Sequence, residues 1–153
     1  MSSDYWTYSA TEIVENIKSQ NLSAVNVIES HLHRISATNG VINAVVTLSE
    51  EAALNQAKDI DKRVSNGEQV GLLAGVPIGV KDVTATAGIR TTFGSPLFAD
   101  HIPDKDDIIV QRIKEADGII IGKTNTPEFA TGGNTYNDVF GATRNPWNTE
   151  LSA

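Results

Sequence analysis

Residues 75–82 have the sequence Gly75-Val76-Pro77-Ile78-Gly79-Val80-Lys81-Asp82. In a β-strand, successive side chains point to opposite faces. One face of this stretch carries branched apolar side chains suited to a core, those of Val76, Ile78 and Val80. The other face carries Pro77, Gly79 and Lys81, so it is nearly bare until it reaches the lysine ammonium. The stretch therefore predicts a strand over residues 76–83 that leaves room for another group to approach Lys81.

A lysine in this setting is a candidate general base. A lysine must be neutral to accept a proton, and desolvation lowers its pKa because burial disfavours the ammonium. The bare face would place Lys81 where such desolvation is possible. The alternative is that Lys81 ends an edge strand and points into water, and these eight residues taken alone favour that alternative.

Composition limits the classes of protein to consider. The chain has 153 residues, of which 40% are hydrophobic and 20% charged, as expected for one globular domain. The net charge of −7 argues against a nucleic-acid partner or an acidic membrane surface. The absence of cysteine excludes disulfides, thiolate metal sites and a cysteine nucleophile. No stretch approaches the ~20 apolar residues of a membrane-spanning helix, and the N-terminus lacks the features of a secretory signal. We therefore expect a cytoplasmic protein without a cofactor.

The sequence before residue 71 predicts an outer layer of helices. Three helices are predicted, at residues 10–19, from Ser23 to Asn39-Gly40, and at about residues 50–64. The first begins with a capping box, in which Ser9 is followed three residues later by Glu12. Residues Val41–Leu48 are rich in β-branched side chains, and whether they pair in a sheet is left open.

The sequence from residue 71 onward predicts the start of a sheet. The strand at 76–83, a helix at about 107–116 and the apolar run Ile119-Ile120-Ile121 together indicate a βαβ unit with parallel strands. A run that is apolar at every position is typical of a strand covered on both faces. Thr126-Pro127 favours the start of a further helix. We expect an α/β protein with a single domain, in which residues 1–70 form the helical layer and residues 71–153 begin the sheet core.

Three patterns suggest a ligand site only weakly. Gly122-Lys123-Thr124 resembles the end of a phosphate loop, but Asp117 stands where that loop requires its first glycine. His31 and His33 are two positions apart on a predicted helix, so they point to different faces. The aspartates of residues 100–107 lack the glycine and closing glutamate of a calcium loop, and we expect them to cap the next helix. No metal site is therefore expected.

Four groups of residues occur in order from Gly75 onward. They are Gly75-Val76-Pro77 with Val80-Lys81-Asp82; Thr92 with Gly94-Ser95; Gly122-Lys123-Thr124-Asn125 with Glu128-Phe129-Ala130; and Gly141 with Thr143-Arg144-Asn145-Pro146-Trp147. Together they resemble the amidase signature family. The resemblance covers nearly the whole chain and is strongest over residues 75–147. Four ordered motifs are far more specific than any one of them.

The resemblance implies an α/β/α sandwich whose mixed sheet is covered by helices. It also implies hydrolysis of the C–N bond of a carboxylic amide to a carboxylate and ammonia or an amine. The family uses a serine nucleophile, a second serine in a cis peptide, and a lysine. Lys81 occupies the position of that lysine, which takes the nucleophile's proton through the cis serine. For Asp82 we expect a structural role on the opposite face. Gly132, Gly133 and Asn134 are candidates for a wall of the substrate site, although glycines also end helices.

The chain departs from the family pattern at its end. The family's glycine- and serine-rich signature follows the position of Trp147, whereas this sequence ends at Leu151-Ser152-Ala153. We therefore expect a truncated, N-terminal portion of an amidase that lacks both catalytic serines, and Ser152 is not assigned as a nucleophile. A cut fragment, a truncated reading frame and a processed product are all compatible with this expectation.

Three functions remain open at this point. The first is an amidase that acts on a small-molecule amide. The second is the amide-hydrolysing subunit of a glutamine-dependent amidotransferase. The third is a non-catalytic binding module, if the sequence is complete as given. The expected partners are the amide substrate and either further copies of the chain or the C-terminal portion; neither nucleic acid nor a membrane is expected.

Overall fold

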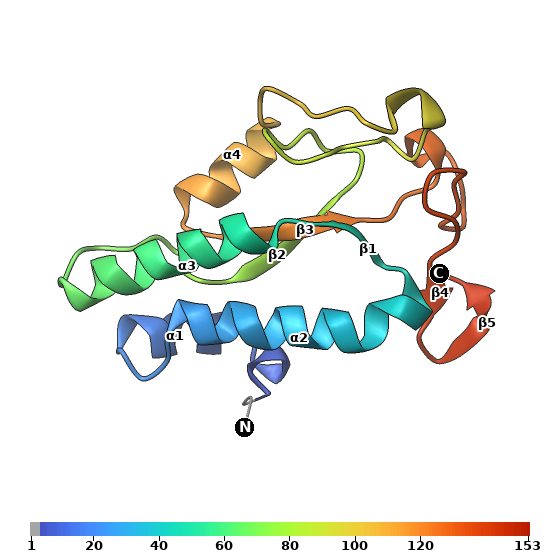
Figure 1. Ribbon diagram of the computed structural model, residues 1–153. Coiled ribbons are helices and arrows are strands. Elements are labelled where there is room, and N and C mark those ends of the chain that lie inside the picture. Colours follow the sequence, from blue (N-terminus) through green and yellow to red (C-terminus); the bar gives the residue numbers. More distant parts are fainter. Residues whose placement is uncertain (1–3) are drawn as a thin grey trace. The chain divides into compact units, whose positions relative to one another are not determined.

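The computed structural model describes residues 4–153 and contains four α-helices and five strands among them (Figure 1). The helices are α1 (Ala10–Lys18), α2 (Ala24–Ile42), α3 (Glu50–Ser65) and α4 (Ile108–Glu115). The strands are β1 (Val45–Leu48), β2 (Pro77–Lys81), β3 (Ile119–Thr124), β4 (Arg144–Asn145) and β5 (Asn148–Ser152). Short 3₁₀ turns lie at Tyr5–Thr7, Pro96–Phe98 and Glu128–Ala130.

The chain divides into two compact units. Unit 1 comprises Met1–Ile35, Ser49–Ile78 and Gln111–Ile121. Unit 2 comprises Ser36–Leu48, Gly79–Val110 and Gly122–Ala153. No helix among residues 4–153 is both long enough and apolar enough to cross a membrane.

The predicted helices are present, and one of them is longer than predicted. The capping box of α1 is confirmed, because Ser9 Oγ accepts from Glu12 N at 3.2 Å and a Glu12 carboxylate oxygen accepts from Ser9 N at 2.7 Å. The predicted end of α2 at Asn39-Gly40 is wrong. The Asn39 side chain instead accepts from the backbone N–H groups of Ala44 and Val45, each at 2.9 Å. The helix continues to Ile42 and is followed by Asn43, whose φ of 54° is the left-handed conformation common after helix ends.

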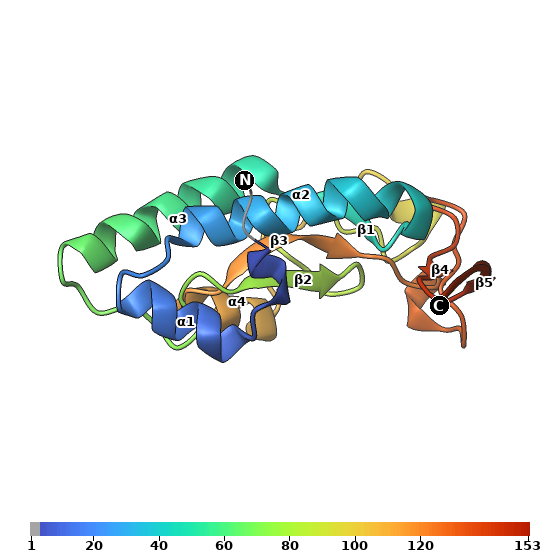
Figure 2. The ribbon, with the colours of Figure 1, turned by 90° about the horizontal axis from the view of Figure 1, so that it is seen from below.

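The sheet contains three strands in the order β1-β3-β2 (Figure 2). β2 and β3 are parallel: Ile119 N donates to Val76 O at one end of the pair, and Asp82 N donates to Thr124 O at the other. Helix α4 connects these two strands, so the predicted βαβ unit is confirmed. β1, which the sequence left open, pairs antiparallel with β3 and makes the sheet mixed. β4 and β5 form a separate two-stranded antiparallel sheet.

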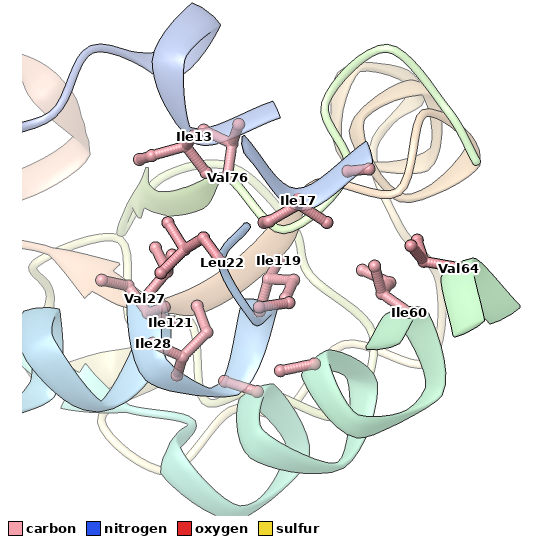
Figure 3. Packing of buried hydrophobic residues seen from close by; sticks show 14 residues of the cluster. Ile13, Ile17, Leu22, Val27, Ile28, Ile60, Val64, Val76, Ile119 and Ile121 are labelled. Atoms are coloured by element: carbon pink, nitrogen blue, oxygen red, sulfur yellow. The ribbon is translucent and has the colours of Figure 1, made fainter. Parts of the chain in front are cut away.

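Unit 1 holds a hydrophobic core around β3 (Figure 3). Ile119 is fully buried, and Ile120 and Ile121 are only 4% and 7% exposed, which confirms the prediction of a strand covered on both faces. In Figure 3, Ile13 and Ile17 of α1 and Ile60 of α3 point into the same cluster as Ile119. Gly75 permits the close approach of α1, because a Cβ at this position would lie 2.3 Å from Ile17 Cδ1.

In unit 1, an ion pair between Arg63 and Asp117 joins α3 to the turn before β3. Arg63 donates from both terminal nitrogens to the Asp117 carboxylate, at 2.7 and 2.9 Å. The same carboxylate accepts from Gly71 N at 2.6 Å. The hydrogen bonds from Arg63 lower the pKa of Asp117. Asp117 has a φ of 62°, so this residue both turns the chain and anchors it.

Unit 2 contains long loops that are held by side-chain hydrogen bonds. Asn137 donates to Asn125 Oδ1 at 2.7 Å and to Thr126 O at 2.8 Å. Asn43 Nδ2 donates to Phe140 O at 2.8 Å, and Thr143 Oγ1 donates to Asn43 O at 2.7 Å. These bonds order a segment that has little regular secondary structure.

The short helix predicted after Thr126-Pro127, with Glu128-Phe129-Ala130 as its first turn, is present only as a 3₁₀ turn. The segment forms only the three-residue turn Glu128–Ala130, in which Phe129 and Ala130 have positive φ values of 48° and 58°. Phe129 N donates to Phe93 O at 2.8 Å, which draws the backbone toward the neighbouring loop. This long-range bond replaces the helical bonds that the local sequence favours.

Candidate active site

Lys81 is the last residue of β2, and its side chain is exposed. The residues on either side of it, Val80 and Asp82, are buried, at 6% and 0% exposure. The strand therefore alternates between a buried and an exposed face at this end, as the sequence predicts. On the exposed face, a Cβ at Gly79 would lie 2.9 Å from Thr124 Cγ2 of β3. The absence of a side chain at Gly79 leaves space beside Lys81.

The Lys81 ammonium makes no hydrogen bond or ion pair with any residue in the described range 4–153. A carboxylate partner would stabilise the ammonium form, and an ammonium cannot accept a further proton. The geometry at the end of β2 thus leaves the Lys81 amine available to another group.

Asp82 anchors the loop that follows Lys81. Its buried carboxylate accepts from the backbone N–H and the hydroxyl of Thr92, and its carbonyl oxygen accepts from Phe93 N at 2.9 Å. The Thr92 hydroxyl in turn accepts from Gly94 N at 3.0 Å. Asp82 therefore has the structural role expected from the sequence, and it bonds the first motif directly to the second.

Lys123 is fully buried, which the sequence pattern did not predict. It lies in β3 rather than in a loop, so the Gly122-Lys123-Thr124 segment is not part of a phosphate loop. Its ammonium donates to Thr84 O, to Thr86 Oγ1 at 2.9 Å and to Thr91 Oγ1 at 3.0 Å. Burial lowers the pKa of Lys123 to about 8, against the opposing effect of nearby carboxylates, of which Asp82 is the strongest. At pH 7 the side chain is therefore a buried cation.

The aspartates at the end of the same loop bind backbone N–H groups. Asp106 Oδ1 accepts from Ala87 N and Asp107 Oδ2 accepts from Ala85 N, both at 2.7 Å. No group of three or more metal-ligating side chains occurs in the part of the chain that the structure describes.

Gly132, Gly133 and Asn134 form an exposed turn after the Glu128–Ala130 segment. A Cβ at Gly132 would lie 3.0 Å from Pro127 Cβ, whereas a Cβ at Gly133 would meet no atom within 4 Å. The turn is followed by Asn137, whose hydrogen bonds to Asn125 and Thr126 hold the segment in place. No hydrogen bond in the described residues joins the turn to Lys81.

A comparison with protein families identifies the chain. The family described as Amidase matches residues 26–153. The chain belongs to the amidase family. The resemblance of its four motifs to the amidase signature is thereby confirmed, together with the α/β fold class.

Curated relatives include a glutamyl-tRNA(Gln) amidotransferase subunit of Carboxydothermus hydrogenoformans. It is 45% identical over 142 residues, which are 93% of this chain but 29% of that protein. The chain thus spans about 29% of the length of this relative.

Solved structures of similar fold include amide-hydrolysing enzymes. A bacterial aryl acylamidase of the amidase signature family is 34% identical with a TM-score of 0.88, and the match covers 95% of this chain and 30% of that one. A protein from a vestigial complex related to the origins of an s-triazine catabolic enzyme is 38% identical with the same TM-score, over 93% of this chain and 31% of that chain. These matches support the arrangement of helices and strands over nearly the whole chain.

Proposed function

We propose that this chain supplies the catalytic lysine of an amidase that hydrolyses the C–N bond of a carboxylic amide. The observation that carries the proposal is the family match over the motif that contains Lys81, and in the structure this lysine lies at the end of β2 with no partner in the described residues. Family membership supports the reaction class. The hydrogen bonds that join the following loop to Asp82 support a fixed position for the base.

The chemistry follows from what a neutral amine can do. Lys81 would accept a proton from the nucleophilic serine by way of the second serine, and the serine oxygen would then attack the amide carbonyl. Collapse of the tetrahedral intermediate breaks the C–N bond, and the leaving nitrogen takes up the proton. Water then hydrolyses the acyl-enzyme to the carboxylate. Neither serine is assigned within residues 1–153.

We also propose that the turn at Gly132-Gly133-Asn134 forms one wall of the substrate site. The turn is exposed, and the free space around a Cβ at Gly133 would admit another group. Its attachment through Asn137 supports a defined rather than a variable wall.

The test of Lys81 uses two substitutions in the intact protein. Lys81→Ala and Lys81→Arg should each lower kcat by at least ~100-fold, because neither side chain can accept the proton at neutral pH. Circular dichroism should be unchanged, since no core side chain is removed. Lys105→Ala, which removes a lysine outside the proposed machinery, should keep the wild-type rate. If Lys81→Arg kept most of the activity, Lys81 would be only a fixed positive charge and the proposal would be wrong.

A second candidate function is the amide-hydrolysing subunit of a glutamine-dependent amidotransferase. The observation that favours it is the 45% identity to an amidotransferase subunit, against 34% to the aryl acylamidase. The two functions differ in their need for a partner protein. Ammonia release from glutamine that appears only when a partner protein is added supports the amidotransferase, whereas hydrolysis of simple amides without a partner supports the amidase.

A further inference from the structure

The environment of Lys123 is built for a cation. Its three acceptors are one backbone carbonyl, that of Thr84, and two hydroxyls, those of Thr86 and Thr91. Each hydroxyl donates its single proton elsewhere: Thr86 Oγ1 donates to Thr84 O at 3.2 Å, and Thr91 Oγ1 donates to Ile89 O at 3.0 Å. Both hydroxyls therefore present lone pairs to Lys123. An ammonium has three N–H donors for these three acceptors, whereas a neutral amine has only two.

The acceptors belong to the loop that directly follows Lys81. Lys123 holds this loop near its start, at Thr84 and Thr86, and again at Thr91. The next residue, Thr92, is held by the Asp82 carboxylate. The loop is thus fixed by a buried cation from β3 and a buried anion next to Lys81. Asp82, Asp107 and Asp106 are the charged groups that act on the cation.

We propose that Lys123 is a positioning residue for Lys81: its buried ammonium fixes the loop of residues 84–92 to β3 and thereby holds the end of β2 in place. The part of this inference that concerns Lys81 rests on the proposed function. The part that concerns the loop does not, because it follows from the hydrogen bonds of Lys123 itself.

The first test measures the loop and not the reaction. In the intact protein, Lys123→Met keeps the length and apolar volume of the side chain but leaves three buried acceptors without a donor. Amide hydrogen exchange should therefore increase in residues 84–92 and remain unchanged in α1. Lys81→Met is the matched control, because it removes a lysine from the adjacent strand while the loop should keep its protection. Equal protection of residues 84–92 in wild type and Lys123→Met would overturn the proposal.

The second test adds a small free ammonium ion to a variant that lacks the Lys123 side chain. Lys123→Ala leaves a space lined by the same acceptors, and ethylammonium is small enough to enter it and carries three N–H donors. We expect Lys123→Ala to lower kcat by roughly 10- to 100-fold through misplacement of the base, with a smaller change in KM. Ethylammonium should restore part of kcat, whereas tetramethylammonium at equal ionic strength should not, because it has no N–H. Restoration by both ions, or by neither, would overturn the positioning role.

A measurement on the unaltered protein covers the case in which the Lys123 variants do not fold. Nitrogen-15 labelling of the lysine side chains should reveal, at pH 7, an ammonium signal that is protected from exchange with water. Because this signal belongs to Lys123, it should remain in every Lys81 variant. The absence of a protected ammonium would contradict a buried, hydrogen-bonded Lys123. If Lys81→Met retained activity while the exchange results held, the proposed function would fail and the role of Lys123 in the loop would stand.

Discussion

Lys81 and Lys123 lie in adjacent parallel strands but have opposite surroundings. Lys81 is exposed and has no partner in the described part of the chain, whereas Lys123 is fully buried with three acceptors. The proposed base must lose its proton to work, and the buried lysine must keep its proton to satisfy the loop. Neighbouring residues of one type thus have two proposed tasks because their partners differ: Lys123 has three fixed acceptors, whereas Lys81 has none among the described residues.

The titration of Lys123 has a consequence for stability. Its pKa is about 8 in the folded protein, against 10.5 for an ordinary lysine. Between these two pH values the unfolded chain holds more protons at this position than the folded chain, so folding becomes more favourable as pH rises. We expect the free energy of unfolding of wild type, minus that of Lys123→Met, to increase from pH 8 to pH 10. Urea unfolding at several pH values measures this difference, and a decrease over the same range would contradict the lowered pKa.

The alternation around Lys81 could be predicted from sequence because it depends on neighbouring residues. The burial of Lys123 could not, because its partners Thr84, Thr86 and Thr91 lie 32 to 39 residues earlier in the chain. One signal was available: Lys123 lies two residues after the apolar run Ile119-Ile120-Ile121 within a single strand. A lysine that continues a doubly buried strand must find acceptors inside the protein.

At the scale of elements, the ion pair of Arg63 and Asp117 joins α3 to the turn before β3 in unit 1. Both side chains are mostly buried, with 28% and 14% of the side chain exposed, and the pair is bidentate. Asp117 also accepts from Gly71 N, so removal of its charge affects three segments at once. A pair of this kind contributes more than an exposed one.

Asp117→Asn should lower the free energy of unfolding at pH 7 by about 1–3 kcal/mol, because it weakens charge-assisted hydrogen bonds while asparagine tolerates the left-handed backbone. The pKa of Asp117 is lowered in the folded state. The contribution of its charge is therefore complete above the ordinary carboxyl pKa and is lost as pH falls through the lowered value. Urea unfolding at pH 7 and at pH 2.5, where stability permits, should show a smaller difference from wild type at the acid pH.

Asp59→Asn is the control for this pair. Asp59 also approaches Arg63, at 3.6 Å, but 62% of its side chain is exposed. Its replacement should change stability by less than about 0.5 kcal/mol. Equal losses of stability in the Asp59 and Asp117 variants would show that burial of the Arg63–Asp117 pair adds nothing to the free energy of unfolding.

The pairing of β1 with β3 depends on a glycine. A Cβ at Gly122 would lie 2.3 Å from Thr47 O of β1, so Gly122→Ala should force the strands apart and cost about 1–3 kcal/mol. Gly40→Ala is the matched control with the opposite sign, because Gly40 lies in α2 with no atom within 4 Å of an added Cβ. It should stabilise the protein by about 0.5–1 kcal/mol. Thermal unfolding of both variants tests the pair, and a stable Gly122→Ala protein would contradict the close contact.

The sequence predicted the βαβ unit, whereas the pairing of β1 could not be predicted from it. Short strands give weak patterns, and β1 begins only after Asn39 and Asn43 have ended α2 and directed the chain toward the sheet. The short helix expected after Thr126-Pro127 is a 3₁₀ turn for a similar reason, since the bond from Phe129 to Phe93 outweighs local preference. Elements defined by local periodicity were predictable, whereas those defined by distant partners were not.

At the scale of the whole molecule, the three-stranded sheet has β1 and β2 as its outer strands among the described residues. Large apolar side chains are also exposed, including Leu97 at 85% and Trp147 at 95%. Unpaired strand edges and exposed apolar side chains both promote association. We expect residues 1–153 alone to form oligomers or aggregates at micromolar concentration, and light scattering coupled to gel filtration measures this. A monodisperse monomer with a cooperative thermal transition would contradict the expectation.

The same 153 residues should not hydrolyse amides by themselves. A base has nothing to activate without a nucleophile, and no nucleophile is assigned in this chain. A panel of aliphatic and aryl amides, followed by ammonia or amine release, should give no rate above that of the Lys81→Ala variant. Turnover that depends on Lys81 would instead locate a nucleophile within these residues.

The hydrogen bonds of Asn43 have a consequence for synthesis on the ribosome. Their partners at Phe140, Ala142 and Thr143 lie 97 to 100 residues further along the chain. At roughly 5–20 residues per second, β1 emerges from the ribosome about 5–20 seconds before the segment that completes its surroundings. Unit 1 needs nothing beyond Ile121, so its core can close during translation while β1 still awaits these partners. Nascent chains of this protein therefore expose β1 to chaperones until this later segment has been synthesised.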